Sequence, residues 1–335
     1  MKPMRLGIIG PGLIWQFKHR PVLDRLKGDF AVTAFCASSD RHQADVARDY
    51  PGVPFVTDLD AFLHRDDVDA VVVLTPIPLN GPMSLAALRA GKDVFVEKPM
   101  AHKPEDGQAL VETAGRTGRR LWVLEQDAYA HRWRQVRDVV QSGEIGELVA
   151  YEQVAHWPLD DGSYARGGYG KTAWRIQPDF PLGILFDGGH HLIAALSTLF
   201  GQASWVFASG VSLRPTFGEY DHVLMQFGYA GKLRGTLSYS SLLGSGRNYF
   251  HIRGTQGLAT VEDDRLTITR DDGGTRTLEL SPEDMHEQMW RALAQCIAQN
   301  REPEYTKECA LRDLSILFGV ERAIKIGDKA LLGQV

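Results

Sequence analysis

Residues 69–99 have the sequence DAVVVLTPIPLNGPMSLAALRAGKDVFVEKP, and this stretch decides the fold. Residues 69–75 are almost continuously apolar, which is typical of a parallel strand buried on both faces. A helical pattern follows over 81–91, where Gly91 is placed to end the helix. Residues 93–99 then form a second apolar strand. A strand, a helix and a second strand in about thirty residues predict a βαβ unit of a parallel sheet.

The same alternation fills the rest of the first third of the chain. Further strands are predicted over 5–10, 30–37, 54–57 and 120–126, and further helices over 14–26, 42–49, 58–65 and 103–118. This repetition predicts an α/β domain, a doubly wound parallel sheet of the Rossmann type, over residues 1–123.

Residues 124–335 have a different pattern, which predicts an α+β domain with a large, mostly antiparallel open sheet. Helices are predicted over 132–146, 185–201, 283–300 and 307–327, and strands that alternate with period two over 147–157, 204–213, 221–243 and 248–270. Turn signals separate or join these strands. A long polar and aromatic loop covers 158–183.

Composition excludes several classes of protein. The 335 residues carry a formal net charge of −5, with acids and bases interspersed, which argues against nucleic acid as the partner. The three cysteines are far apart and have no metal-ligand spacing, which indicates free thiols in a reducing compartment. No export signal or bilayer-spanning stretch is visible. We therefore expect a soluble, cytoplasmic protein without a membrane partner.

The segment GIIGPGLIW, residues 7–15, suggests a nucleotide site. Gly10 and Gly12 occupy the first two positions of a G-x-G-x-x-G turn, where the backbone can approach a pyrophosphate at a helix N-terminus. The third position is Trp15 instead of a small residue. The alternative is a tight turn that binds nothing.

The end of the second strand bears on the choice of cofactor. A carboxylate there would bind the ribose of NAD, but residues 37–41 are Ala-Ser-Ser-Asp-Arg. Ala37 occupies the strand end, and Ser38, Ser39 and Arg41 suit a 2′-phosphate, which favours NADP(H). Alternatively this is a plain polar turn in which Asp40 caps the next helix.

Glu97 and Lys98 leave their strand at the carboxyl edge of the sheet, where ligands bind in open α/β folds, and Pro99 fixes the turn. The alternative is a surface ion pair.

A further candidate is LFDGGHHLIAAL, residues 185–196. Asp187 and His191 are four residues apart and would share one helix face, and the imidazole suits a general base. Gly188 and Gly189 are costly in a helix and make sense if something approaches closely. One alternative is that Asp187 only caps the start of the helix. Another is a zinc site formed by Asp187, His190 and His191, but no further ligands stand at a recognised spacing, which disfavours it. No metal is expected.

Aromatic and hydrogen-bonding side chains in the long loop would suit a sugar-like ligand. They are Tyr164, Tyr169, Lys171, Trp174 and Arg175. A flexible or inter-subunit loop is the alternative.

Four segments in this order resemble the Gfo/Idh/MocA oxidoreductases, the family of glucose–fructose oxidoreductase and inositol dehydrogenase. They are GIIGPGLIW, AGKDVFVEKP, GEIGELV and AWRIQPDFPLGILFDGGHHLI. The resemblance implies bound NAD(H) or NADP(H), and Lys98 beside the nicotinamide and the substrate. It also implies that Asp187 and His191 complete the catalytic group. In this family the corresponding Lys–Pro bond is often cis, which implies a cis Lys98–Pro99 bond, and the sheet of the second domain often serves for oligomerisation.

The chain departs from the family pattern at three places. Trp15 replaces a small residue, Ile77 and Asn80 stand where an asparagine and a histidine are frequent, and Ala194 replaces an acid. The last change puts the identity of the sugar or cyclitol in doubt.

The sequence therefore predicts an NAD(P)-dependent oxidoreductase that transfers a hydride between the nicotinamide and a secondary alcohol or ketone of a sugar, cyclitol or derivative. Either Lys98 or His191 could accept the proton. The predicted cofactor-binding residues are Gly10, Gly12, Leu13, Ile14, Ala37, Ser38, Ser39, Arg41, Thr75, Pro76, Asn80, Glu97 and Lys98. The predicted substrate-binding residues are Lys98, Tyr129, Trp174, Arg175, Asp187 and His191. A homodimer or homotetramer is expected. Alternatives are a redox-neutral, NAD-dependent glycoside-cleaving enzyme and a non-catalytic nucleotide sensor.

Overall fold

A computed structural model describes residues 2–159, 172–177, 180–214, 218–244, 246–280 and 283–333. Tyr164, Tyr169 and Lys171, which we predicted as ligand contacts, lie outside the described residues. The chain forms two compact units. The first comprises Met1–Gln126 and Met285–Leu314, and the second comprises Asp127–Asp284 and Ser315–Val335.

The first unit contains a six-stranded, fully parallel sheet in the order β3-β2-β1-β4-β5-β6. The strands are β1 (Met4–Ile9), β2 (Phe30–Cys36), β3 (Phe55–Val56), β4 (Ala70–Val73), β5 (Asp93–Glu97) and β6 (Leu121–Leu124). All four residues of β4 are buried, as a strand covered by helices on both faces requires. The predicted Rossmann-type sheet is confirmed.

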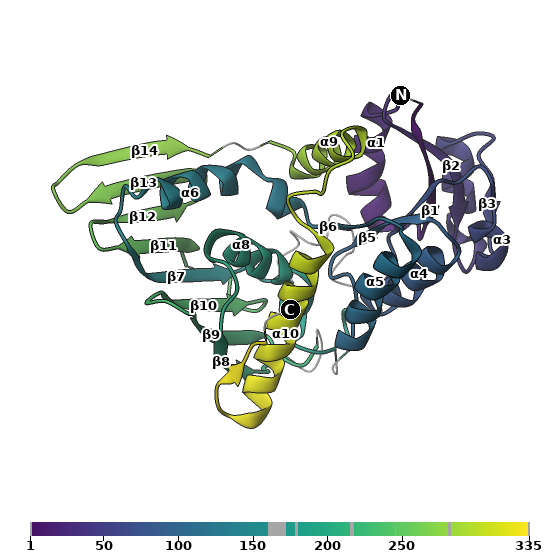
Figure 1. Ribbon diagram of the computed structural model, residues 1–335. Helices are drawn as coiled ribbons and strands as arrows, with labels where there is room; N and C mark the ends of the chain where they lie inside the picture. Colours follow the sequence, from purple (N-terminus) through teal and green to yellow (C-terminus); the bar gives the residue numbers. More distant parts are fainter. Residues whose placement is uncertain are drawn as a thin grey trace. The chain divides into compact units, whose positions relative to one another are not determined.

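Helices cover both faces of this sheet. They are α1 (Arg20–Arg25), α2 (Gln43–Asp49), α3 (Leu59–Leu63), α4 (Ile77–Arg89), α5 (Pro104–Thr117) and α9 (Met285–Ala298). Figure 1 shows α4 and α5 on one side of the strands and α1 and α9 on the other.

Two helices differ from their predicted bounds. The helix predicted over 14–26 contains a π-helical turn, η1 (Trp15–His19), before α1. The helix predicted over 81–91 begins earlier, at Ile77, because Pro78 lies in its first turn, where a missing backbone N–H costs nothing.

The second unit is built on a nine-stranded sheet in the order β14-β13-β12-β11-β7-β10-β9-β8-β15. The strands are β7 (Leu148–His156), β8 (Trp205–Val211), β9 (His222–Gly228), β10 (Arg234–Ser240), β11 (Tyr249–Gly254), β12 (Gly257–Glu262), β13 (Arg265–Arg270), β14 (Thr275–Glu279) and β15 (Ala330–Leu331). β7 and β10 run parallel, and the other neighbours among the described strands are antiparallel.

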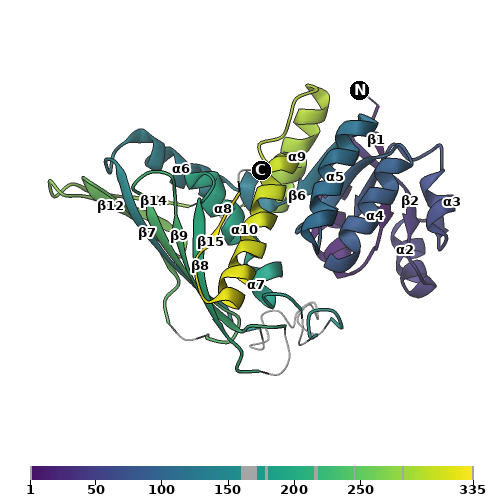
Figure 2. The same cartoon turned by 60° about the horizontal axis from the view of Figure 1, so that its bottom comes forward.

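One face of this sheet is covered by helices, as Figure 2 shows. They are α6 (His131–Ser142), α8 (His190–Phe200) and the part of α10 (Lys307–Ile326) that belongs to this unit. Phe200 of α8 stacks on Tyr151 of β7 with ring centroids 4.8 Å apart. The predicted α+β architecture with a mostly antiparallel sheet is confirmed.

Each compact unit is formed by two separate segments of the chain. We predicted domains of 1–123 and 124–335, whereas the compact units divide after Gln126 and the segment Met285–Leu314 returns to the first unit. The physical reason is Trp290 of α9, which is fully buried against Phe30 and Phe95 of that unit. None of the helices in the described part of the chain is long and apolar enough to cross a membrane.

Candidate functional site

The carboxyl ends of β2, β1 and β4 lie side by side and form the edge where the predicted cofactor residues gather. β1 has β2 on one side and β4 on the other, so the direction of strand order reverses there. In open α/β sheets a ligand binds at this switch point. Gly10, Ala37 and Thr75 each follow one of these three strands.

The two glycines of the first turn have different surroundings. Gly10 has φ +81°, and a Cβ there would lie 2.8 Å from the carbonyl oxygen of Leu74. A Cβ on Gly12 would meet nothing within 4 Å. Gly10 is therefore required by the fold itself, whereas Gly12 borders open space at the N-terminal end of a helical segment. This arrangement fits the diphosphate of a dinucleotide.

Trp15, the departure from the expected small residue, does not obstruct this turn. Its side chain is buried and packs against Phe35 at 5.5 Å and Tyr50 at 5.9 Å between ring centroids. The large residue is therefore used for packing between helix and sheet.

The segment after β2 carries exposed polar side chains. Ser38, Ser39 and Arg41 are all exposed. Asp40 begins the 3₁₀ turn η2 (Asp40–His42), and His42 occupies the N-cap position of α2. The alternative in which Asp40 caps the next helix is therefore wrong.

Asn80 holds the turn that follows β5. Its Nδ2 donates to the carbonyl oxygens of Glu97 and Pro99, each at 3.0 Å, and its Oδ1 accepts from Thr75 Oγ1 at 2.9 Å. The Lys98–Pro99 bond is cis, as the family resemblance implied. The amide of Asn80, predicted as a cofactor contact, is thus committed to the backbone around Lys98.

Glu97 is not part of a surface ion pair, so that alternative is wrong. The residue is 7% exposed. Its Oε1 lies 2.8 Å from Nε2 of His19, and its Oε2 accepts from the backbone N–H of Lys98 at 3.1 Å. The carboxylate is therefore directed at its own turn, which leaves Lys98 as the half-buried residue at the carboxyl end of β5.

In the second unit, Asp187 and Arg175 form a pair. Nε of Arg175 donates to Oδ2 of Asp187 at 2.7 Å, and both side chains are largely buried. Trp174 lies alongside, with its ring 4.0 Å from the guanidinium carbon of Arg175. Arg175 thus contacts two other predicted substrate-binding residues, Trp174 and Asp187.

The helix predicted over 185–201 is two helices, α7 (Ile184–Asp187) and α8. Asp187 ends the first, and no side chain caps α8, whose N-cap is Gly189. The alternative in which Asp187 caps this helix is therefore wrong. The close approach that we inferred from the glycines is internal, since a Cβ on Gly188 would lie 3.1 Å from the Tyr239 hydroxyl and one on Gly189 2.3 Å from Leu185.

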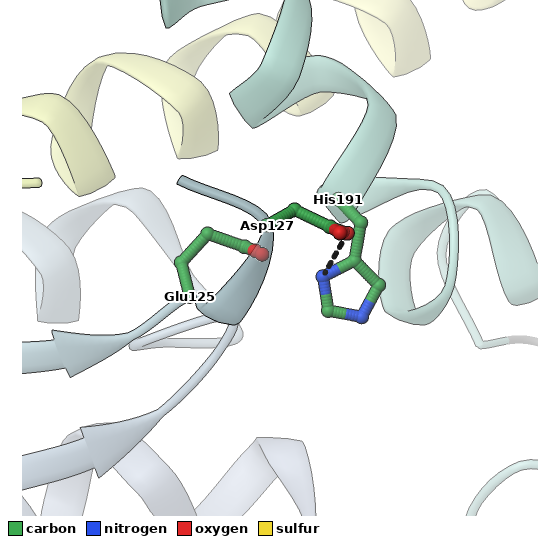
Figure 3. A group of neighbouring side chains, drawn as sticks. All are labelled: Glu125, Asp127 and His191. Atoms are coloured by element: carbon green, nitrogen blue, oxygen red, sulfur yellow. Dashed lines mark ion pairs between the residues drawn. The ribbon is translucent and has the colours of Figure 1, made fainter. Parts of the chain in front are cut away.

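His191, near the start of α8, faces a carboxylate that we did not predict. Its Nδ1 lies 3.5 Å from Oδ2 of Asp127, and Figure 3 shows the two side chains turned toward one another. Glu125, also drawn there, directly follows β6 in the chain. An ionised carboxylate beside Nδ1 favours the tautomer that carries its proton there and leaves Nε2 as the acceptor. Tyr129, two residues after Asp127, is fully buried.

Two family profiles match the sequence of this chain. Residues 4–125 match the profile described as "Oxidoreductase family, NAD-binding Rossmann fold", and residues 133–260 match the GFO/IDH/MocA C-terminal domain. The chain belongs to the Gfo/Idh/MocA family of oxidoreductases. The resemblance found in the sequence is confirmed.

Individual members of the Gfo/Idh/MocA family are distant from this chain. An NADP(+)-dependent scyllo-inositol 2-dehydrogenase, IolW of Bacillus subtilis, is 27% identical over 251 residues, which are 75% of this chain and 66% of the relative. A glycosyl hydrolase family 109 protein of Shewanella is 31% identical over 193 residues, which are 53% of this chain and 41% of the relative. The chain thus spans less than two thirds of the length of either relative.

Among solved structures, an oxidoreductase from Thermotoga maritima superposes with a TM-score of 0.89. It is 25% identical, and the match covers 98% of both chains. The similarity therefore extends over both units of this Gfo/Idh/MocA protein.

Three residues that support predicted site residues were not predicted from the sequence. They are His19, Trp290 and Asp127. The signal for Asp127 was available, because an acid shortly after the last parallel strand lies at the carboxyl edge of the sheet. No local pattern joins His19 to Trp290, since 271 residues separate them.

Proposed function

We propose that this protein transfers a hydride between NAD(P) and a secondary alcohol or ketone of a sugar, cyclitol or sugar derivative. The observation that carries the proposal is the Lys98 turn. A half-buried lysine, in a turn held by Glu97 and Asn80, follows β5 at the same carboxyl edge of the sheet where Gly12 borders open space. An ammonium group at such a position can stabilise an alkoxide oxygen as it forms.

NAD(P), when bound, would supply the hydride acceptor or donor. The turn 10–14, the segment 37–41 and the residues Thr75 and Pro76 would hold it along the carboxyl edge of β1, β2 and β4. The exposed Ser38, Ser39 and Arg41 support a preference for NADP(H), because they offer hydroxyl and guanidinium donors to a 2′-phosphate. The NADP(+) dependence of the Bacillus relative is consistent with that preference.

The proton would be taken by His191. Asp127 beside Nδ1 directs the lone pair of Nε2 outward, as a general base requires. Lys98 would remain charged and polarise the substrate oxygen. Asp187, which pairs with Arg175, would accept hydrogen bonds from substrate hydroxyls.

The test is turnover of Lys98→Met and His191→Asn on a panel of sugars, cyclitols and sugar acids with NAD and NADP, followed at 340 nm. Both variants should bind NADPH as the parent does and lose turnover by about 10³-fold or more, because each removes a group that acts in the transition state. Lys27→Met, at a position with a 74% exposed side chain, is the matched control and should retain activity. Undiminished turnover of Lys98→Met would refute the assignment.

A redox-neutral glycosidase is the second candidate, because a glycosyl hydrolase family 109 protein is among the relatives. Such an enzyme would release nitrophenol from a nitrophenyl glycoside without a net change in absorbance at 340 nm. A dehydrogenase would change the absorbance at 340 nm and would release no nitrophenol.

We also propose that copies of the chain associate through the face of the nine-stranded sheet that the helices leave uncovered, to give a homodimer or homotetramer. Phe207, Val211 and Leu224 project from neighbouring strands on that face and are 40%, 46% and 50% exposed. Exposed apolar groups clustered in this way are typical of protein interfaces.

A further inference from the structure

A buried chain of hydrogen bonds leads from the C-terminal part of the sequence to the Lys98 turn. Nε1 of Trp290 donates to Nδ1 of His19 at 3.0 Å. Nε2 of His19 lies 2.8 Å from Oε1 of Glu97, and Oε2 of Glu97 accepts from the Lys98 backbone N–H at 3.1 Å. All four residues belong to the first unit.

The chemistry of the indole fixes the direction of this chain. Because Trp290 Nε1 can only donate, Nδ1 of His19 must accept. The ring proton of His19 therefore lies on Nε2 and is donated to Glu97. With both carboxylate oxygens accepting, Glu97 is held in one orientation between His19 and the Lys98 backbone.

Burial makes this arrangement rigid. His19 and Trp290 are 0% exposed and Glu97 is 7% exposed. The π-helical turn η1 ends at His19 and has both Trp15 and His19 buried, so the local helix geometry directs the imidazole inward. A hydrogen bond between buried partners is costly to break, because the group left behind is unsatisfied.

Among the described residues, the titratable side chains that pack against His19 come from two elements. Glu97 of β5 forms the hydrogen bond, and His286 of α9 lies edge-on with its ring centroid 5.6 Å away. A second proton on His19 would have to displace the Trp290 N–H from Nδ1. The indole thus keeps the imidazole in its donor form towards Glu97.

We propose that His19 is a positioning residue for Lys98, and that Trp290 keeps His19 in the single tautomer that this role needs. The proposal rests on the function proposed above for Lys98. Helix α9 thereby supports the Lys98 turn through Trp290, although Trp290 lies about two hundred residues further along the chain than Lys98.

The substitutions His19→Met and His19→Gln separate packing from hydrogen bonding. Methionine fills a similar volume without a donor, whereas the glutamine amide can still donate to Glu97. For His19→Met we expect kcat to fall by about 10²-fold with little change in KM, the loss typical of a misplaced catalytic group. His19→Gln should recover most of this loss.

Trp290→Phe keeps an aromatic ring and removes the N–H donor. Without that donor the His19 ring is no longer restricted to one tautomer, so we expect kcat to fall by about tenfold with little change in KM, and the Lys98 amide to exchange faster. In the double variant Trp290→Phe/His19→Gln, kcat should return to that of His19→Gln, because the glutamine amide donates to Glu97 without the indole. Trp122→Phe is the matched control, because Trp122 is buried and stacks on the same Phe95.

Hydrogen exchange of the Lys98 amide gives a result that does not depend on turnover. A peptide covering 97–100 contains few amides, because Pro99 has none, so the Lys98 amide is a large part of its signal. Exchange in this peptide should accelerate in His19→Met and remain slow in His19→Gln, while peptides from the centre of β5 stay protected in both. If no substrate is ever found, the proposed function fails, but this experiment still decides whether His19 holds the turn.

Two outcomes would overturn the proposal. One is a folded His19→Met variant with parental kcat and parental exchange at Lys98. The other is a folded Trp290→Phe variant with parental kcat and parental exchange at Lys98.

Discussion

Gly10 and Gly12, two residues apart, show how surroundings give one residue type two different tasks. Gly10 adopts a left-handed conformation that L side chains rarely enter, and it lies against the Leu74 carbonyl. Gly12 has an ordinary conformation and open space around it. The sequence motif does not distinguish the two glycines, whereas the structure shows that the fold requires Gly10 and that Gly12 borders open space.

Alanine at each position should therefore have a different effect. Gly10→Ala should lower the free energy of unfolding by about 1–3 kcal/mol, because it adds strain and a clash with backbone. Gly12→Ala should leave stability within about 0.5 kcal/mol and weaken NADPH binding by about tenfold or more. Thermal unfolding and fluorescence titration measure the two effects. Equal loss of stability in both variants would contradict this distinction.

At the scale of secondary structure, two helices are interrupted beside residues that we propose for the site. The π turn η1 ends at His19, and the break between α7 and α8 separates Asp187 from His191. Both helices were predicted as continuous, because the apolar periodicity passes through the interruptions. The Gly188-Gly189 pair was the visible signal of the second break, and its cause is contact with Leu185 and Tyr239 of the same unit.

Gly189→Ala should disturb this break. The added Cβ would lie 2.7 Å from the Leu185 carbonyl oxygen, which is backbone and cannot easily move away. We expect a loss of about 1–3 kcal/mol in unfolding free energy and a larger loss of kcat than of cofactor binding, because α8 carries His191. Gly188→Ala is the control, since its nearest neighbour is the Tyr239 hydroxyl at 3.1 Å. Equal effects of the two variants would argue against this explanation.

At the scale of the whole molecule, the chain leaves the first unit after Gln126 and returns to it at Met285. Composition and periodicity describe α9 as an amphipathic helix but do not say which apolar surface it will cover. Trp290 covers Phe30 and Phe95, so the return is driven by burial of aromatic surface. The sequence therefore predicted the helix but not the aromatic surface of the first unit that it covers.

The uncovered sheet face should decide the oligomeric state. Leu224→Lys places a charge beside Phe207 and Val211, and we expect a smaller assembly by light scattering coupled to gel filtration. Ile326→Lys, at a residue of α10 that is 57% exposed, should leave the mass unchanged. An unchanged mass for Leu224→Lys would place the interface elsewhere.

By itself, the sequence determined the Rossmann-type sheet, the mostly antiparallel second sheet and the family, and the family resemblance in turn implied the cis Lys98–Pro99 bond. The two sheets and the family follow from local periodicity, glycine and proline placement and short motifs, all of which act over a few residues. The tertiary structure alone decided that Trp290 and His19 support Glu97, that Asp127 faces His191, and that Arg175 pairs with Asp187. Those partners lie on different segments of the chain, from 12 residues apart for Arg175 and Asp187 to 271 for His19 and Trp290, and only the packing of the folded elements brings each pair together.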